Sequence, residues 1–452
     1  MIAFLLVAAL WSAEPRPNIV VLFADDLRYD ALGTFGNDEV NTPHLDDLAR
    51  RGTAFTHCFN MGSLNPAVCM PSRAMLLSGR TLFHVPVQLT GVKTWPQHLR
   101  EQGYAAYGIG KWHNGPASHA AAFNEGAAVF FGGMSDHFKL PIFDFAADGK
   151  YPKERQKAGD KHSSELFADE AIRFLEGYKR DQPFFLYCAF WAPHDPRTAP
   201  REYGSLYDPA KLKLPRSFLP EHPFDNGELR VRDELLAPFP RKAEAIRRHT
   251  ADYYAMITHL DAQIGRILKT LDETGQAKNT IIVFAADNGL AVGRHGLMGK
   301  QNLYDHSVRV PLLMAGPGIP AGKKSDAMCY LLDLFPTTCD LAALPIPKEV
   351  EGKSLRPMID GKETRVRSEV FGAYRDFQRS IRTDRWKLIR YPQINLTQLF
   401  DLQNDPDELE NLARQPEQAE QVLEMTKQLV ALQQTLDDPL PLAAKQKQKQ
   451  KK

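Results

Sequence analysis

Three short apolar runs, each followed at once by polar residues, constrain the fold of this 452-residue chain more than any other feature. The runs cover residues 18–24, 183–191 and 280–286 and are rich in β-branched and aromatic side chains. Strands that are buried on both faces of a sheet have this composition. The polar residues that follow them are, in order, Asp25-Asp26, Ala192-Pro193-His194 and Asp287-Asn288.

Helical periodicity precedes two of these runs. Apolar residues recur at helical spacing over 167–178, before the second run, and over 254–271, before the third. Strands that alternate with helices favour an α/β fold in which a mostly parallel sheet is sandwiched by helices. Sheets of this kind carry their chemistry beyond the carboxyl ends of the strands, and all three polar clusters fall at such ends.

The pattern changes near residue 352. Residues 380–389 alternate in strand fashion, 398–402 offer another strand, and 409–436 have helical periodicity. We therefore expect a main domain over 14–350 and a smaller antiparallel sheet with a helix over 351–440.

The two ends of the chain differ from the rest. Residues 2–13 are almost wholly apolar and a proline-rich break follows, which predicts a signal segment over 1–13 and export to the periplasm or the exterior. A buried first strand or helix is the alternative, since no basic residue precedes the run. Twelve residues are too few to cross the ~30 Å hydrocarbon core, so stable membrane insertion is not expected. The Lys- and Gln-rich residues 441–452 predict a disordered basic tail.

The charge balance bears on the class of partner. Fifty-six Lys and Arg residues oppose 55 Asp and Glu residues, for a net charge of +1, so no overall field favours nucleic acid. Five cysteines are too few for a disulfide scaffold, and their odd number leaves at least one unpaired within the chain.

Asp25, Asp26, Asp287 and Asn288 would place three carboxylates and one amide oxygen at neighbouring strand ends. Oxygen ligands of this kind suit calcium or magnesium, and packed carboxylates without a cation would repel one another and raise a pKa. Each pair alone is also ordinary for a turn or a helix cap. Two pairs at the ends of two buried strands favour a metal site.

Cys69 precedes Pro71, Ser72, Arg73 and an apolar stretch of helical character. A cysteine near an arginine and a helix N-terminus would have a lowered pKa and nucleophilic character, whereas a plain buried thiol is the usual state of a cysteine. The residues alone leave both open.

Further cationic and imidazole side chains lie in loops that follow expected strands. With Arg73, they would form a pocket for a small tetrahedral anion beside a metal, although a single histidine or lysine in a loop is more often a solvated residue. They are Lys111, His113, His194 and Lys300.

Together these motifs resemble the type I sulfatases of the alkaline-phosphatase-like superfamily. The family signature, C-x-P-S-R followed by L-x-G-R, is matched by residues 69–73 and 77–80. The resemblance runs over nearly the whole chain and includes Gly110-Lys111-Trp112-His113, Asp287-Asn288-Gly289 and His295-Gly296-Leu297 with Gly299-Lys300. One departure is Asp305 after Tyr304, where the family often has glutamate; we expect a structural role for Asp305.

The resemblance implies an alkaline-phosphatase-like fold and hydrolysis of a sulfate monoester to an alcohol and inorganic sulfate. Together with export, it favours a carbohydrate sulfate over a small aryl sulfate, and a choline-type substrate stays open. It also implies that a formylglycine-generating maturation enzyme oxidises Cys69 to formylglycine, whose hydrate is the nucleophile. One calcium ion would be bound by Asp25, Asp26, Asp287 and Asn288. Arg73 and Lys111 would hold the hydrate and His113 would contact its second hydroxyl. His194 and Lys300 would bind sulfate oxygens, and one of them would help to protonate the leaving oxygen.

Two other functions stay open at this point: phosphonate monoester or phosphodiester hydrolysis at the same site, and non-catalytic binding of sulfated glycans. Residues 130–151 and 193–240 are long, aromatic and charged, so we expect them to shape the substrate pocket. Candidates within them for contacts to a carboxylate or sulfate on a sugar are His137, Lys139, Arg197 and Arg232. With Cys69 converted, at most two bridges could form among Cys58, Cys188, Cys329 and Cys339, and Cys188 is expected to be a plain buried thiol.

Overall fold

The first apolar run forms β1 (Asn18–Ala24), the central strand of the larger of two main sheets in the computed structural model, which describes residues 15–442. From one edge to the other, that sheet contains β11 (Lys323–Ser325), β2 (Thr53–Phe59), β10 (Arg309–Ala315), β9 (Thr280–Ala286), β1, β8 (Phe184–Ala189), β4 (Ala105–Lys111) and β5 (Glu125–Phe130), and β12 (Cys329–Tyr330) also pairs with β2. Strands β9, β1, β8, β4 and β5 are mutually parallel, and β10 is antiparallel to both neighbours. The expected mostly parallel sheet is confirmed.

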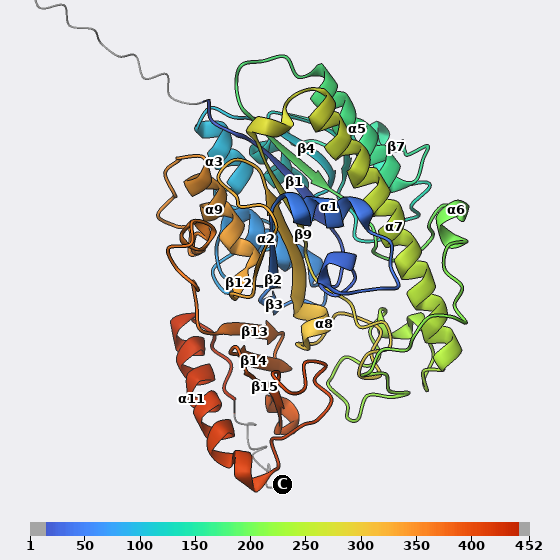
Figure 1. Ribbon diagram of the computed structural model, residues 1–452, viewed down its shortest axis with the longest axis vertical. Helices are drawn as coiled ribbons and strands as arrows, with labels where there is room; N and C mark the ends of the chain where they lie inside the picture. The colour runs from blue at the N-terminus through green and yellow to red at the C-terminus, as the bar shows by residue number, and fades with distance from the viewer. Residues whose placement is uncertain (1–14, 443–452) are drawn as a thin grey trace, which may run out of the picture.

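Helices cover both faces of this sheet (Figure 1). One layer contains α1 (Pro43–Arg51), α5 (Ser163–Gly177), α6 (Arg201–Gly204) and the 31-residue α7 (Ala243–Glu273), against which the other three pack. The opposite layer contains α2 (Cys69–Ser78), α3 (Trp95–Glu101), α4 (Pro116–Ala122), α9 (Leu334–Leu341) and α10 (Arg356–Ile359). The apolar stripe expected over 254–271 is buried along α7. The core therefore lies between the sheet and its two helical layers.

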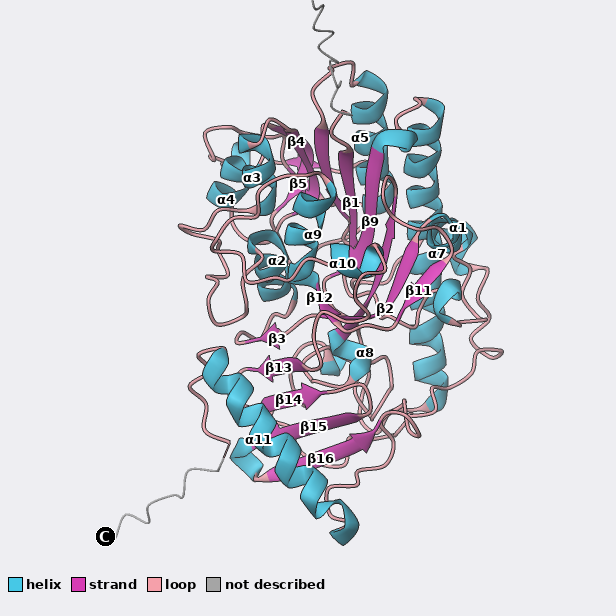
Figure 2. Ribbon diagram, turned by 60° about the vertical axis from the view of Figure 1, so that its left-hand side comes forward, coloured by secondary structure: helices cyan, strands magenta, loops and turns pink. Residues whose placement is uncertain are grey.

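A smaller sheet forms the other end of the molecule (Figure 2). It contains β13 (Val370–Tyr374), β14 (Gln378–Arg382), β15 (Trp386–Tyr391) and β16 (Leu396–Asp401) as an antiparallel meander, and α11 (Ala419–Thr435) packs across β14 and β15. Strand β3 (Gly62–Ser63) comes from the N-terminal part of the chain and pairs in parallel with β13. The smaller sheet is thus completed by a segment that leads into α2.

The remaining elements are short. They are β6 (Pro141–Ile142) paired with β7 (Lys157–Ala158), α8 (Asp305–Val308), and 3₁₀ helices at Gly33–Phe35, Lys153–Arg155, Glu234–Leu236, Ala277–Asn279, Leu331–Asp333, Pro392–Ile394 and Pro416–Gln418.

Two expectations for the C-terminal part are wrong in detail. Residues 380–389 do not form one strand, because a turn at 383–385 divides them between β14 and β15; the Thr383 hydroxyl accepts a hydrogen bond from the Trp386 N–H and closes the turn. The expected helix over 409–436 begins ten residues later, at Ala419. Asn411 caps the end of β16 instead, by accepting the Leu399 N–H, and Pro416 opens a 3₁₀ turn.

Buried charges join the two sheets. Asp305, in α8, forms ion pairs with Lys387 of β15 (2.7 Å), Arg382 of β14 (3.4 Å) and Arg309 (3.7 Å). These cations lower the pKa of Asp305 although its burial opposes ionisation. The contacts account for Asp305 as a structural residue that anchors the smaller sheet.

Two further expectations concern chain ends and cysteines. The signal segment predicted over 1–13 and most of the tail predicted over 441–452 lie outside the described residues. Within residues 15–442, no helix is both long and apolar enough to cross a membrane. That part of the chain includes all five cysteines, and each is a buried free thiol.

Candidate active site

The polar clusters meet because of strand register. β1 pairs with β9 so that Ala24 lies opposite Ala286, which brings Asp25 and Asp26 beside Asp287 and Asn288. All four polar residues are buried. Asp26 has a left-handed backbone (φ 64°), and its N–H donates to Asp287 Oδ1 at 3.1 Å. The four predicted metal ligands therefore occupy one site, although they come from opposite halves of the sequence.

Arg73 ties α2 to three strand ends. Its Nε donates to Asp287 Oδ2 (3.0 Å), one terminal nitrogen donates to Asp25 Oδ2 (3.1 Å), and the other donates to the Lys111 carbonyl (3.0 Å). The guanidinium is fully buried, and the Lys111 ammonium forms a second ion pair with Asp25 Oδ2. This network fixes the N-terminal turn of α2, where Cys69 is the first residue.

The three carboxylates have unequal electrostatic environments. Burial opposes the ionisation of Asp25, but Lys111 and Arg73 hold its pKa well below its usual value. Burial raises the pKa of Asp26 and of Asp287 to about 6, and the Asp25 charge adds to both shifts. Repulsion between the packed carboxylates, as predicted, contributes to the raised pKa of two of them, although burial is the larger cause.

The residues alone left two states open for Cys69, a lowered pKa and a plain buried thiol. Burial and the nearby Asp25 carboxylate raise the pKa of its thiol well above the usual value, so the lowered pKa is wrong and the buried thiol is what the structure has. The reason is that Arg73 turns away from the thiol toward the carboxylates, and Lys300 Nζ, 3.0 Å from Sγ, does not compensate for burial. A protonated buried thiol is a weak nucleophile.

Lys300, His194 and His113 surround Cys69. Lys300 Nζ lies 2.5 Å from Asp26 Oδ1, and Asp26 holds its pKa well above the usual value despite burial. Burial and Lys300 lower the pKa of His194 to about 4, and burial with Lys111 lowers that of His113 to about 2. Both imidazoles are therefore neutral at pH 7. His194 Nε2 is 3.7 Å from Asp26 Oδ2, and its Nδ1 donates to the Asp195 carbonyl at 2.7 Å.

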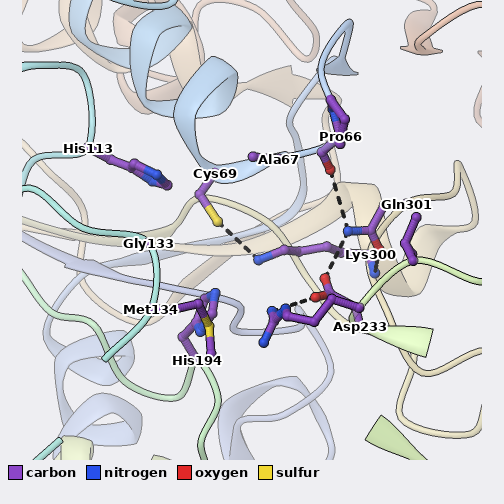
Figure 3. A pocket seen from close by; sticks show the side chains of 12 residues that line it. Pro66, Ala67, Cys69, His113, Gly133, Met134, His194, Asp233, Lys300 and Gln301 are labelled. Carbon is purple, nitrogen blue, oxygen red and sulfur yellow. Dashed lines mark hydrogen bonds and ion pairs between the residues drawn. The ribbon is translucent and has the colours of Figure 1, made fainter. Parts of the chain in front are cut away.

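A pocket of about 400 Å³ opens above this cluster (Figure 3). Its lining comes from α2 and the turn before it, from both loop regions expected to shape it, and from the loop after β9. The lining residues are Pro66, Ala67, Cys69, His113, Gly133, Met134, His194, Val231, Arg232, Asp233, Lys300 and Gln301. Of the four candidate substrate residues in these loops, only Arg232 lines the pocket.

The other three candidates lie elsewhere. His137 is buried behind His194, where its Nε2 donates to the His194 carbonyl at 3.0 Å. Lys139 is exposed, and Arg197 lies over the Tyr253 ring, 5.7 Å from its centroid. Sequence reasoning also missed Asp195, Asp233 and Gln301. Asp195 and Gln301 directly follow the predicted site residues His194 and Lys300, so their positions in the sequence could have indicated them. Nothing in the local sequence marks Asp233 as a site residue.

The donor chemistry of the cluster fits a hard cation. Asp25 and Asp26 each offer an oxygen within 4.8 Å of Cys69 Sγ and a His194 ring nitrogen. Asn288 Oδ1 is buried and has no hydrogen-bond partner among residues 15–442, so this oxygen is available as a metal ligand. Asp287 instead directs one oxygen to Arg73 and the other to the N–H groups of Asp26 and Asn288. Hard oxygen ligands of this kind suit calcium or magnesium.

Comparison with known proteins decides the family. Residues 17–344 match the sulfatase family model. The chain belongs to the sulfatase family. Residues 293–435 of this sulfatase also match the model for the C-terminal region of N-sulphoglucosamine sulphohydrolase. An arylsulfatase of Clostridium perfringens is 30% identical over 92% of this chain and 94% of its own. An N-acetylglucosamine-6-O-sulfatase of Bacteroides thetaiotaomicron is 26% identical over 94% and 88% of the two chains.

Solved structures agree on the fold. One, determined in complex with its substrate D-glucosamine-2-N,6-O-disulfate, superimposes with a TM-score of 0.80 at 24% identity and covers 94% of this chain and 99% of its own. A phosphonate monoester hydrolase of Agrobacterium radiobacter superimposes with a TM-score of 0.75 at 21% identity, over 93% and 96%. At these identities the likeness concerns fold alone. The alkaline-phosphatase-like fold is confirmed, and the alternative of phosphonate hydrolysis is not favoured.

Family membership also shows to which class of enzyme the chain belongs. This sulfatase is a sulfuric ester hydrolase, as its family and its named relatives show. Non-catalytic glycan binding is therefore set aside.

Proposed function

We propose that this sulfatase hydrolyses a sulfate monoester on a carbohydrate, with a formylglycine made from Cys69 and one calcium ion. The position of Cys69 is the main support for this proposal. Cys69 begins α2 at the floor of the pocket, and Lys300, His113 and His194 surround it. Relatives named for N-acetylglucosamine-6-O-sulfatase and ulvan-active sulfatase activity support a carbohydrate. The raised pKa of the thiol supports conversion, because an unmodified Cys69 would stay protonated.

Each residue of the floor has a separate task. When present, the formylglycine would supply a hydrated aldehyde as nucleophile, and calcium held by Asp25, Asp26, Asp287 and Asn288 would supply positive charge for the sulfate oxygens. Arg73 and Lys111 neutralise Asp25 and keep residue 69 in place. Nδ1 of His113 is buried and has no hydrogen-bond partner in the described part of the chain, so it can contact a hydroxyl.

Lys300 and His194 would bind the sulfate group itself. The Lys300 ammonium lies 3.0 Å from the sulfur of residue 69 and stays charged, so it can bind an anionic oxygen there. The Asp195 carbonyl orients the His194 ring by accepting from Nδ1, which directs Nε2 toward Asp26. Of the two, Lys300 carries the proton that the leaving alcohol would take, because the single N–H of the neutral His194 ring is donated to the Asp195 carbonyl.

Production beside a formylglycine-generating maturation enzyme, the proposed partner of this chain, tests the role of Cys69. We expect the peptide that contains residue 69 to have the mass of the aldehyde, and Cys69→Ala to lose sulfate release by about 10³-fold or more. Cys339→Ala, in α9 and outside the pocket, is the matched control and should keep activity. An active protein in which residue 69 remains cysteine would contradict the proposal.

Calcium removal tests the metal. We expect chelation to abolish sulfate release, calcium to restore it, and calcium to raise the Tm of the chelated protein, because an ion that binds only the folded state stabilises it. Asp287→Asn should weaken calcium binding measured by calorimetry. Asp181→Asn, which removes an exposed carboxylate, should not. Unchanged activity and Tm after chelation would rule the metal out.

Export and the domain limits also belong to this proposal. We propose that residues 1–13 direct export to the periplasm or the exterior, and that 14–350 form the catalytic domain and 351–440 the smaller C-terminal unit. Sequencing of the N-terminus of the secreted protein tests the first point, since an intact Met1 would contradict it.

A further inference from the structure

The wall of the pocket beside Lys300 contains a carboxylate that sulfate binding does not use. Asp233 lines the pocket and is only 5% exposed. One of its oxygens pairs with Arg232, and the other accepts a hydrogen bond from Gln301 Nε2 at 2.8 Å (Figure 3). Burial opposes its ionisation, but Lys300 and Arg232 lower the pKa of Asp233 below its usual value. Asp233 is therefore an anion at neutral pH.

Asp233 is held in place and has acceptor capacity left. A carboxylate can accept about four hydrogen bonds, and among the described residues Asp233 accepts one from Gln301 and forms an ion pair with Arg232. Gln301 is itself fixed, because its Oε1 accepts from the Lys300 N–H at 3.0 Å. The Asp233 carboxylate is therefore rigid, and its remaining lone pairs lie on the pocket wall next to Lys300, the cation expected to bind sulfate.

Arg232 does not make this wall attractive to a second anion. Its guanidinium pairs with both oxygens of Asp195, one of them at 3.2 Å, as well as with Asp233. Arg232 and its two partners, Asp195 behind the pocket and Asp233 in its lining, thus carry one positive charge against two negative charges, and the positive charge of the neighbouring Lys300 would be taken up by the sulfate ester. A carboxylate or second sulfate placed here would meet net negative charge, whereas a hydroxyl or ammonium group would find a charged acceptor.

We propose that Asp233 is a specificity-determining residue that accepts a hydrogen bond from a hydroxyl or amino group of the substrate beside its sulfate ester. The preferred substrate would therefore be a monosulfated sugar with a hydrogen-bond donor at that position, and sugars with a second anionic group there would be poor substrates. This inference rests on the proposed function, since it concerns the same pocket.

Asp233 could also act only by holding Gln301 and hence the Lys300 loop. The two roles predict different kinetics. A positioning role reduces turnover of every sulfate ester in parallel, because Lys300 contacts the group common to all. A specificity role changes the ratio between substrates that differ only beside the sulfate.

The test compares wild type, Asp233→Asn and the control Asp181→Asn, all matured. Sulfate release is measured from 4-nitrophenyl sulfate, from hexose and hexosamine monosulfates, and from partners that carry a second sulfate or a uronate carboxylate. We expect Asp233→Asn to lower kcat/KM for the monosulfated sugars by roughly tenfold or more, the usual effect of losing a hydrogen bond to a charged group. The doubly anionic partners should lose less or gain, and Asp181→Asn should match wild type.

Failure of the proposed function and failure of the role of Asp233 would give different results. A matured protein that releases sulfate from none of these compounds contradicts the proposed function. An active protein in which Asp233→Asn lowers all rates in parallel, or lowers none, contradicts only the role of Asp233. A wild type that prefers the doubly anionic sugars also overturns that role.

Discussion

Arg73 illustrates how one side chain holds this active site together. Its three buried hydrogen bonds join α2 to the ends of β1, β4 and β9. The planar guanidinium presents donors in several directions at once, which a lysine ammonium on a flexible stem does not reproduce. Cys69 owes its position at the pocket floor to this contact, because it starts the same helix.

Arg73→Lys is expected to leave Asp287 without its buried cation, or Asp25 with Lys111 alone. We expect the free energy of unfolding, measured in urea, to fall by about 3 kcal/mol, the range for breaking a buried ion pair. Sulfate release should fall roughly 100-fold as residue 69 shifts. Arg50→Lys is the matched control, since the Arg50 side chain is 69% exposed and pairs with Asp47 on the surface of α1. Equal effects of the two substitutions would contradict this account.

At the scale of elements, the loop after β9 depends on glycine to bring Lys300 into the site. Gly296 has φ +72°, and a Cβ there would lie 2.3 Å from the backbone carbon of Glu221. Glu234 holds the same loop by accepting the N–H groups of Met298 (2.9 Å) and Gly299 (2.8 Å). The loop is therefore packed closely against residues 221–234, which also supply the pocket wall.

Gly296→Ala should displace this loop, because neither the backbone angle nor the space suits a side chain. We expect a loss of about 2 kcal/mol in the free energy of unfolding and at least a roughly tenfold lower kcat/KM. Gly322→Ala separates backbone strain from steric clash. Gly322 has φ +66°, but among the described residues no atom lies within 4 Å of its Cβ position. It should lose about 1 kcal/mol and no activity. A Gly296→Ala enzyme of normal activity would show that the loop tolerates the shift.

At the scale of the whole molecule, polar contacts join the large sheet region to the C-terminal part. His84, shortly after α2, places Nδ1 2.7 Å from Glu351 Oε1 and Nε2 2.8 Å from Asp437 Oδ2, just beyond α11. Partial burial opposes protonation, but hydrogen bonds to the two carboxylates raise the pKa of His84. The charged imidazolium is thus the form that links the two regions.

This link makes stability depend on pH. Because the folded-state pKa is raised, the stabilisation by His84 is fully present below the unfolded-state pKa of about 6.5 and is lost as pH rises through the higher folded-state value. We expect the difference in free energy of unfolding between wild type and His84→Gln to be about 0.5–1 kcal/mol larger at pH 6 than at pH 9, since the site is partly solvated. Asp437→Asn should diminish the same difference. A pH-independent difference would exclude the charged bridge.

Much of the architecture could be predicted because it follows from local patterns. The buried strands, the periodicity of α7 and the polar residues at strand ends depend on neighbours in the sequence, and the structure has each of them. The element boundaries in the C-terminal part could not be predicted as well. The turn at 383–385 and the delayed start of α11 depend on single side-chain contacts of Thr383 and Asn411, which hydrophobic periodicity does not report.

The sequence by itself determined the strand-end chemistry, the signature around Cys69 and, through them, the family. Only the tertiary structure decided how these groups behave. Burial and Asp25 raise the pKa of the Cys69 thiol, which decides between the two states that the sequence had left open. The tertiary structure likewise pairs the Arg232 guanidinium with two carboxylates and places Asp233 on the pocket wall. The physical reason is that desolvation and Coulomb interactions depend on distances between residues far apart in the chain, and folding alone sets those distances.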